Sequence, residues 1–93
     1  MPIRVNVPSA LQSFSRGARS VQLAHGGVTV RDALRELAVA HPGVVDRVLT
    51  ESVELREHVN VFVGEENCRF IGGLAAQVQD GDTLEVVASV SGG

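Results

Sequence analysis

The stretch that decides how this chain folds is residues 80–93, DGDTLEVVASVSGG. Its first three residues are typical of a tight turn, and the apolar residues that follow predict a strand inside a sheet. The Ser-Gly-Gly at residues 91–93 adds nothing to a core, because glycine has no side chain to bury and loses much conformational freedom on ordering. The stretch therefore predicts a rigid strand that carries a flexible tip ending in the Gly93 carboxylate.

This tip has two interpretations. When extended, residues 91–93 reach about 10 Å beyond Val90, at about 3.3–3.6 Å per residue, so they could thread into a narrow pocket of another protein. The alternative is an ordinary frayed terminus, which is common at chain ends. The tail by itself leaves both interpretations open.

Length and composition predict a single domain over residues 1–90, followed by the tail at 91–93. The 93 residues suffice for one modest core, and 44% hydrophobic and 20% charged residues are ordinary for a globular protein. A net charge of −3, scattered basic residues and only three aromatic side chains give nucleic-acid binding little support. The start of the chain has no long apolar run of a signal peptide or membrane span, and a single cysteine excludes an internal disulfide, so we expect a cytoplasmic protein.

All eight basic residues are arginine, and lysine is absent. Codon bias explains this composition, but it has one chemical consequence. An activated carboxyl group at Gly93 would find no ε-amine on its own chain, and the α-amine is the only primary amine left.

Hydrophobic periodicity predicts one main helix and several strands. Thr29 is expected to cap the helix, with Asp32 approximating a capping box, and an apolar stripe runs from Val30 to Ala38 until His41-Pro42-Gly43 ends it. Segment 9–17 is expected to be irregular with Phe14 as an anchor, and segment 50–58 to be an exposed connection. Alternation predicts strands at residues 3–7, 19–23, 59–63 and 68–70 and after the 80–82 turn, with one or two helical turns over 44–49.

This element order predicts an α+β domain of the β-grasp type, in which a mixed sheet of four to five strands carries one main helix on one face. Hairpins at both ends allow the first and last strands to pair in the middle of the sheet. The expected core consists of Val5, Val7, Val21, Leu34, Leu37, Val61, Val63, Leu84 and Val86.

On two of the predicted strands, the residues that alternate with the core-facing ones predict an apolar patch on the uncovered sheet face. Phe62 lies between inward Val61 and Val63, and Val87 lies beside inward Val86, so both side chains should point away from the helix. Neighbouring large apolar side chains on a surface favour a partner-binding site, although single exposed apolar residues are common and need no function.

The sequence contains no self-contained catalytic or metal-binding pattern. No Cys/His cluster has metal-ligand spacing, and Gly72-Gly73 is not followed by the Lys-Ser/Thr of a phosphate loop. We interpret His25, His41 and His58 as solvated side chains and Cys68 as a small buried hydrophobe, whose further role stays open. The pattern favours a binding or carrier domain over an enzyme, with no cofactor of its own.

Several motifs together resemble a known family. These are the β-grasp pattern, the Phe70-x-Gly72-Gly73-Leu74 bend, the Asp-Gly-Asp turn at 80–82, and the terminal Val90-Ser91-Gly92-Gly93. They are similar to the ubiquitin-like sulfur carriers of the MoaD/ThiS-like family, which include the small subunit of molybdopterin synthase and the thiamine sulfur carrier. The run from Val59 to Asp82 is most similar to the actinobacterial carriers that feed a dedicated cysteine synthase.

The resemblance implies a mechanism. An ATP-dependent adenylyltransferase of the ubiquitin-activating type would adenylate Gly93, and a sulfur donor (a sulfurtransferase or sulfide) would convert it to a thiocarboxylate. Gly92 would give the tail access to the partner, and Phe62, Val87, Phe70, Val90 and Ser91 would form the partner-binding surface. A PLP-dependent cysteine synthase is the expected client; molybdopterin, thiamine or natural-product synthesis, a protein modifier, and a plain interaction subunit are the alternatives.

Overall fold

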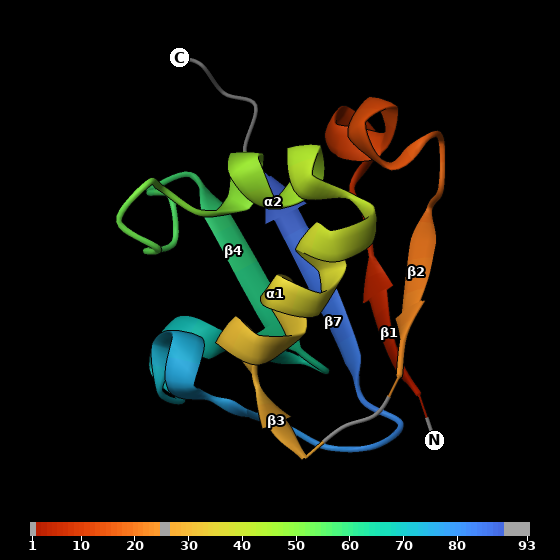
Figure 1. Ribbon diagram of the computed structural model, residues 1–93. Coiled ribbons are helices and arrows are strands. Elements are labelled where there is room, and N and C mark those ends of the chain that lie inside the picture. Colours follow the sequence, from red (N-terminus) through yellow and green to blue (C-terminus); the bar gives the residue numbers. More distant parts are fainter. Residues whose placement is uncertain (1, 25–26, 89–93) are drawn as a thin grey trace.

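The computed structural model describes residues 2–24 and 27–88, which form a mixed sheet covered on one face by helices (Figure 1). The sheet has five strands in the order β2-β1-β7-β4-β5. Strands β1 and β7 are parallel, and the other neighbouring pairs are antiparallel. The α+β, β-grasp architecture predicted from the sequence is confirmed. The strands of this sheet are β1 (Ile3–Asn6), β2 (Ser20–Leu23), β4 (Val59–Val63), β5 (Glu66–Asn67) and β7 (Thr83–Ala88).

The first and last strands lie side by side in the middle of the sheet, as predicted. Val5 of β1 is opposite Leu84 of β7, and on the other side of β7 Val86 is opposite Val61 of β4. Because β7 has a hydrogen-bonded neighbour on each side, its backbone is held more firmly than that of an edge strand.

The main helix, α1 (Val30–Ala40), begins at the predicted capping box. The Asp32 backbone N–H donates to Thr29 Oγ1 at 3.1 Å, and the Thr29 backbone N–H donates to Asp32 Oδ2 at 3.4 Å. These bonds satisfy two of the N–H groups that a helix start leaves unpaired. The apolar stripe of α1 faces the sheet, with Ala38 at its partly buried edge.

A second helix, α2 (Pro42–Val48), follows after the single residue His41. Pro42 suits the first turn, because a helix start has no use for its missing N–H. Of the four apolar residues that predicted one or two helical turns, Val44, Val45 and Val48 are buried in α2, and Leu49, directly after its end, is partly buried.

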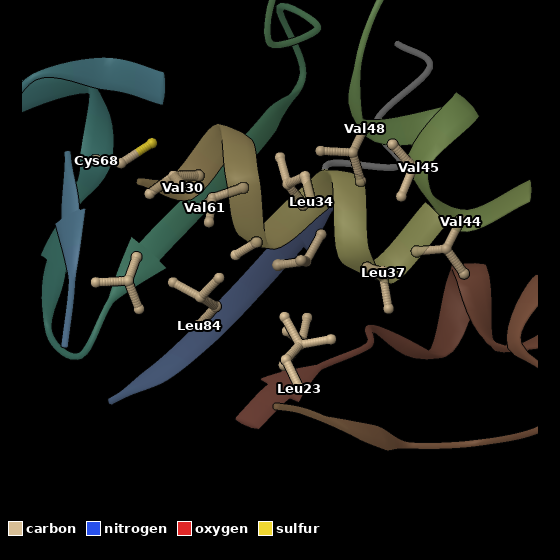
Figure 2. Packing of buried hydrophobic residues seen from close by; sticks show 14 of the residues in the cluster. Leu23, Val30, Leu34, Leu37, Val44, Val45, Val48, Val61, Cys68 and Leu84 are labelled. Atoms are coloured by element: carbon tan, nitrogen blue, oxygen red, sulfur yellow. The ribbon is translucent and has the colours of Figure 1, made fainter. Parts of the chain in front are cut away.

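The core lies between the helices and the sheet, where side chains of α1 and α2 meet those of β4 and β7 (Figure 2). Leu34, Leu37 and Leu84 are fully buried, and each contributes about 1.5–3 kcal/mol through removal of its apolar surface from water. The nine predicted core residues all belong to this cluster, although Val21 and Val63 are only partly buried.

One predicted strand is wrong. The sequence pattern assigned residues 68–70 to a strand, but the strand that pairs with β4 is β5 at Glu66–Asn67, and Cys68–Phe70 forms a 3-10 helix, η2. The cause is Asn67, whose side-chain Oδ1 accepts the Arg69 backbone N–H at 3.0 Å and thereby caps a helical turn.

Two further local expectations need correction. Segment 9–17 is not irregular, because Ser9–Ser15 forms a 3-10 helix, η1, in which Leu11 and Ser15 are buried. Phe14 is 37% exposed, so Leu11 and not Phe14 is the anchor of this segment. The 50–58 connection is exposed as predicted, apart from the half-buried Thr50 and Leu55; Leu55 bridges to Leu49.

A second, two-stranded sheet joins β3 (Val28–Thr29) to β6 (Gln77–Val78). The sequence did not predict it, because strands of two residues have no readable period. The predicted bend at Gly72-Gly73 leads into it through the 3-10 helix η3 (Gly73–Ala75). Gly72 has a φ of +121°, a conformation that other residues rarely adopt.

Candidate functional site

The end of β7 is the centre of the candidate site, because the chain continues from it to the predicted carrier tail. Ala88, the last residue of β7, is opposite Val59 in β4 and lies at the end of the sheet near α2 (Figure 1). Residues 89–93 lie outside the described part of the chain. The roles assigned to Val90, Ser91, Gly92 and Gly93 therefore stay predictions.

A groove of about 540 Å³ lies beside Ala88. The buried side chains Leu11 and Val59 contribute to its lining, and Phe14, Arg47 and His58 are exposed at it. The Arg47 guanidinium lies 4.0 Å from the centre of the Phe14 ring, which is within the range of a cation–π contact. The groove is therefore apolar in its depth and carries positive charge at its rim.

Sequence reasoning missed this groove. Its lining comes from η1, α2, the connection before β4, and the ends of β4 and β7. The only hint in the sequence was Phe14, which stands out as an aromatic residue in a polar segment.

The uncovered sheet face carries Phe62 and Val87, as the strand parity predicted. Val87 is opposite Asn60 and Phe62 is opposite Glu85, so the two apolar side chains are diagonal neighbours on adjacent strands. Val87 is 42% exposed, whereas Phe62 is half-buried. The patch is small, and its assignment to partner binding stays a prediction.

Phe70 is the third described residue assigned to partner binding. It is 84% exposed and lies on η2, outside the strand that the sequence predicted for it. The structure therefore places Phe70 on a helical turn after β5, whereas Phe62 and Val87 lie on paired central strands.

Arg69 fastens η2 to the start of β4. Its Nε donates to Asn60 Oδ1 at 2.9 Å, and its Nη2 donates to the backbone carbonyls of Arg56 and Val59, each at 2.8 Å. Asn60 Oδ1 also accepts the Asn67 side-chain amide at 3.2 Å. These bonds make Arg69 a structural residue, which holds β5, β4 and the preceding connection together.

Cys68 is fully buried, which confirms its interpretation as a small buried hydrophobe. Burial raises the pKa of its thiol, while a backbone hydrogen bond with Val61 and the charge of Arg69 act in the opposite direction more weakly. A buried thiol kept in its protonated form is a poor nucleophile. His58 is exposed and His41 half-buried, and His25 lies outside the described residues.

Among the described residues, no three His, Cys, Asp or Glu side chains gather where they could hold a metal ion. In the same part of the chain, no helix has the length and apolarity needed to cross a membrane.

The fold and this site define a class of protein: a β-grasp domain whose last strand lies in the centre of its sheet and leads to the C-terminal segment. The ThiS family matches residues 5–93, and the chain belongs to this family.

The relatives include sulfur carrier proteins and small archaeal modifier proteins. The chain is 32% identical over 95 residues to the sulfur carrier protein CysO of Mycobacterium tuberculosis, covering 100% of both chains. A chain in the crystal structure of the Amycolatopsis orientalis BexX/CysO complex has a TM-score of 0.86 and 36% identity, and the match covers 98% of this chain and 99% of that one. Small archaeal modifier protein 1 of Haloferax volcanii is 38% identical over 78 residues, which are 83% of this chain and 85% of the relative.

These similarities confirm the predicted family and the conclusion that the chain is not itself an enzyme. It is a sulfur carrier of the CysO, ThiS and MoaD type.

Proposed function

We propose that this chain carries sulfur as a thiocarboxylate on the C-terminal carboxyl group of Gly93. A C-terminal carboxylate has a pKa of about 3.3–3.7, so at neutral pH it is ionised and unreactive toward nucleophiles. It must therefore be activated before sulfur can replace one of its oxygen atoms.

Activation proceeds by adenylation. A carboxylate oxygen attacks the α-phosphorus of ATP, pyrophosphate leaves, and an acyl-adenylate forms on an adenylyltransferase of the ubiquitin-activating type. Hydrosulfide, supplied as such or through a sulfurtransferase, then attacks the carbonyl carbon. The new carbon–sulfur bond replaces the carbon–oxygen bond to AMP, which departs with its electron pair. ATP is thus a substrate of the activating partner, and this chain needs no cofactor.

The observation that carries this proposal is that the family match runs through the tail to Gly93. The geometry where the tail begins supports it, because Ala88 is paired with Val59 of β4 and the first half of the same strand is also paired with β1. A firmly held strand that leads to glycines without side chains suits insertion into a narrow catalytic pocket.

A PLP-dependent cysteine synthase is the client that we propose first. The full-length similarity to CysO supports this choice. Enzymes of molybdopterin, thiamine or natural-product synthesis are the alternative clients, and they would receive sulfur from the same thiocarboxylate. Because the proposed activation consumes ATP, we propose that the chain acts in the cytoplasm.

A second function, protein modification, is supported by the similarity to small archaeal modifier protein 1. In that case the activated Gly93 would form an isopeptide bond with a lysine of another protein. Lysine-linked Gly-Gly remnants on other proteins, detected by peptide mass spectrometry, would favour this function over sulfur transfer.

The test of the proposal is intact mass after incubation with ATP, an adenylyltransferase and sulfide. We expect a gain that corresponds to one oxygen replaced by one sulfur, and no gain in a variant that lacks Gly92-Gly93. An unmodified Gly93 with every activating enzyme tried would overturn the proposal and leave an interaction subunit as the better explanation. Full function of the truncated variant would lead to the same conclusion.

A further inference from the structure

We propose that the groove beside Ala88 recognises the activating adenylyltransferase, and that it receives an apolar side chain next to a carboxylate that pairs with Arg47. This inference rests on the proposed function, and it names a contact surface separate from the tail and from the Phe62 and Val87 patch.

The position of the groove is the first argument. Ala88 lines the groove and is the last residue before segment 89–93. This segment spans at most about 17 Å when extended, at about 3.3–3.6 Å per residue. An enzyme that holds Gly93 in its catalytic pocket must therefore approach the end of the sheet where the groove lies.

The lining of the groove is the second argument. Leu11 and Val59 are buried members of the main hydrophobic core, and Phe14 beside them is 37% exposed. Leu11 and Val59 expose little surface, so an apolar side chain that enters the groove removes mainly the exposed surface of Phe14 from water, at about 25 cal/mol per Å². The core beneath is already formed, so the groove needs no rearrangement to accept it.

The charge at the rim is the third argument. Arg56, which also lines the groove, donates from Nε and Nη2 to the Asp46 carbonyl at 3.1 and 2.9 Å. The Arg47 guanidinium has no hydrogen-bond acceptor or ion-pair partner among the described residues. The lining contains one carboxylate, that of Glu57, and two guanidinium groups, those of Arg47 and Arg56. A carboxylate on the partner therefore fits this rim better than a cation does.

Arg47 is also held in place before any partner arrives. Its guanidinium lies on the Phe14 ring, and Phe14 in turn lies against Gly43 of α2. A Cβ atom at position 43 would come within 3.1 Å of Phe14 Cδ1, so glycine gives the ring its room. A side chain positioned in advance loses less conformational entropy on binding.

The experiment measures KM for the carrier and kcat for loading by the adenylyltransferase that modifies the wild-type chain in the intact-mass assay. Arg47→Glu is the main variant. Because Arg47 lies in the last turn of α2, a carboxylate there also opposes the helix dipole, so Arg47→Gln is the second variant. Arg35→Glu is the matched control, since Arg35 is an exposed arginine on the solvent side of α1. The melting temperature of each variant reports its folding.

We expect Arg47→Glu to raise KM about tenfold with kcat little changed, which is the size of effect for a lost close charge pair at an interface. Arg47→Gln and Phe14→Ala should raise KM less, and Arg35→Glu should leave it near the wild-type value. Charge reversal of the matching acidic residue on the enzyme should restore loading of Arg47→Glu.

Equal KM values for Arg47→Glu, Arg47→Gln and Arg35→Glu would overturn the inference about the groove. Loading of the wild-type chain in the same assay would still support the proposed function. Faster loading of Arg47→Glu would also overturn the inference, because it would mean that Arg47 retains the chain's own C-terminal carboxylate in the groove. If no enzyme loads the wild-type chain, the proposed function itself fails.

Discussion

At position 92, the absence of a Cβ atom is the property on which the proposed chemistry depends. A tail that enters a pocket built around bare backbone has no room for a side chain, and glycine alone satisfies this at no steric cost. Gly92 is four positions after Ala88, the last residue that the structure describes, so this requirement is argued from the sequence of the tail.

We expect Gly92→Ala to slow thiocarboxylate formation at least about tenfold, because the added methyl group obstructs entry into the catalytic pocket. The free energy of unfolding should stay within about 0.5 kcal/mol of the wild type, as for other surface substitutions. Single-turnover loading followed by intact mass, together with chemical denaturation, measures both effects. Sulfuration of the variant at the wild-type rate would show that the glycine is not needed.

For Cys68, the environment inside the folded protein decides the chemistry of the side chain. It is the first residue of η2 and is fully buried, and burial raises the pKa of its thiol above the ordinary value. The folded state therefore holds the thiol proton to higher pH than the unfolded chain does. This contribution to stability is complete below the ordinary thiol pKa of about 8.5 and is lost as pH rises from there through the raised folded value.

We accordingly expect the free energy of unfolding to fall with pH above about 8.5, more steeply in the wild type than in Cys68→Ala. A thiol reagent at neutral pH should label the native protein far more slowly than the protein in denaturant. Denaturation curves over the alkaline range and the labelling rates measure these effects. Rapid labelling of the folded protein at neutral pH would contradict the burial of Cys68.

At the scale of elements, the local chemistry of a few residues decides where helices begin. Thr29 and Asp32 form a reciprocal capping box at the start of α1. Asn67 caps η2 with a single bond, in which its side-chain oxygen accepts the Arg69 backbone N–H, and residues 68–70 form a helical turn where the sequence pattern predicted a strand. Capping thus supported one sequence prediction and overturned another.

We expect Thr29→Ala to destabilise the protein by about 1 kcal/mol, the usual effect of removing an N-cap hydroxyl. Thr29→Ser keeps the hydroxyl and should stay close to the wild type. Urea denaturation followed by circular dichroism distinguishes the two. A similar loss in both variants would show that the methyl group of Thr29, and not its hydroxyl, stabilises the start of α1.

At the scale of the whole molecule, the β-grasp topology separates two faces with different tasks. The helices cover one face and bury the core, while Phe62 and Val87 remain on the other face. Because β7 is central, the uncovered face, the groove beside Ala88 and the start of the tail segment all adjoin the same strand. A partner that takes up the tail can therefore contact several surfaces at once.

We expect Val87→Lys to weaken loading by the adenylyltransferase at least about fivefold, because a strongly hydrated ammonium group replaces an apolar contact. Val39→Lys is the matched control, since Val39 is 86% exposed on α1 and lies away from this face. Both variants should unfold within about 0.5 kcal/mol of the wild type. Equal loading of the two variants would remove Val87 from the partner-binding surface.

The sequence alone determined the main elements and the topology. These elements have local hydrophobic periodicities, each of which marks the one face of the element that is buried. They are the strands at residues 3–7 and 59–63, the helix with its stripe from Val30 to Ala38, and the strand after the 80–82 turn. The order of these elements then allows few arrangements, and the β-grasp is the one in which the terminal strands pair in the centre. The carrier tail and the family resemblance could also be predicted from the sequence, because both depend on short motifs of consecutive residues.

Only the tertiary structure decided the rest. The groove beside Ala88 brings together Phe14, Arg47 and His58 from segments far apart in the chain, and no spacing rule connects them. The 3-10 helix at Cys68–Phe70 arose because a side-chain cap at Asn67 outweighed an alternating pattern. Periodicity reports which side of an element is buried, whereas the meeting of distant side chains depends on how the elements pack, and that information exists only in the folded chain.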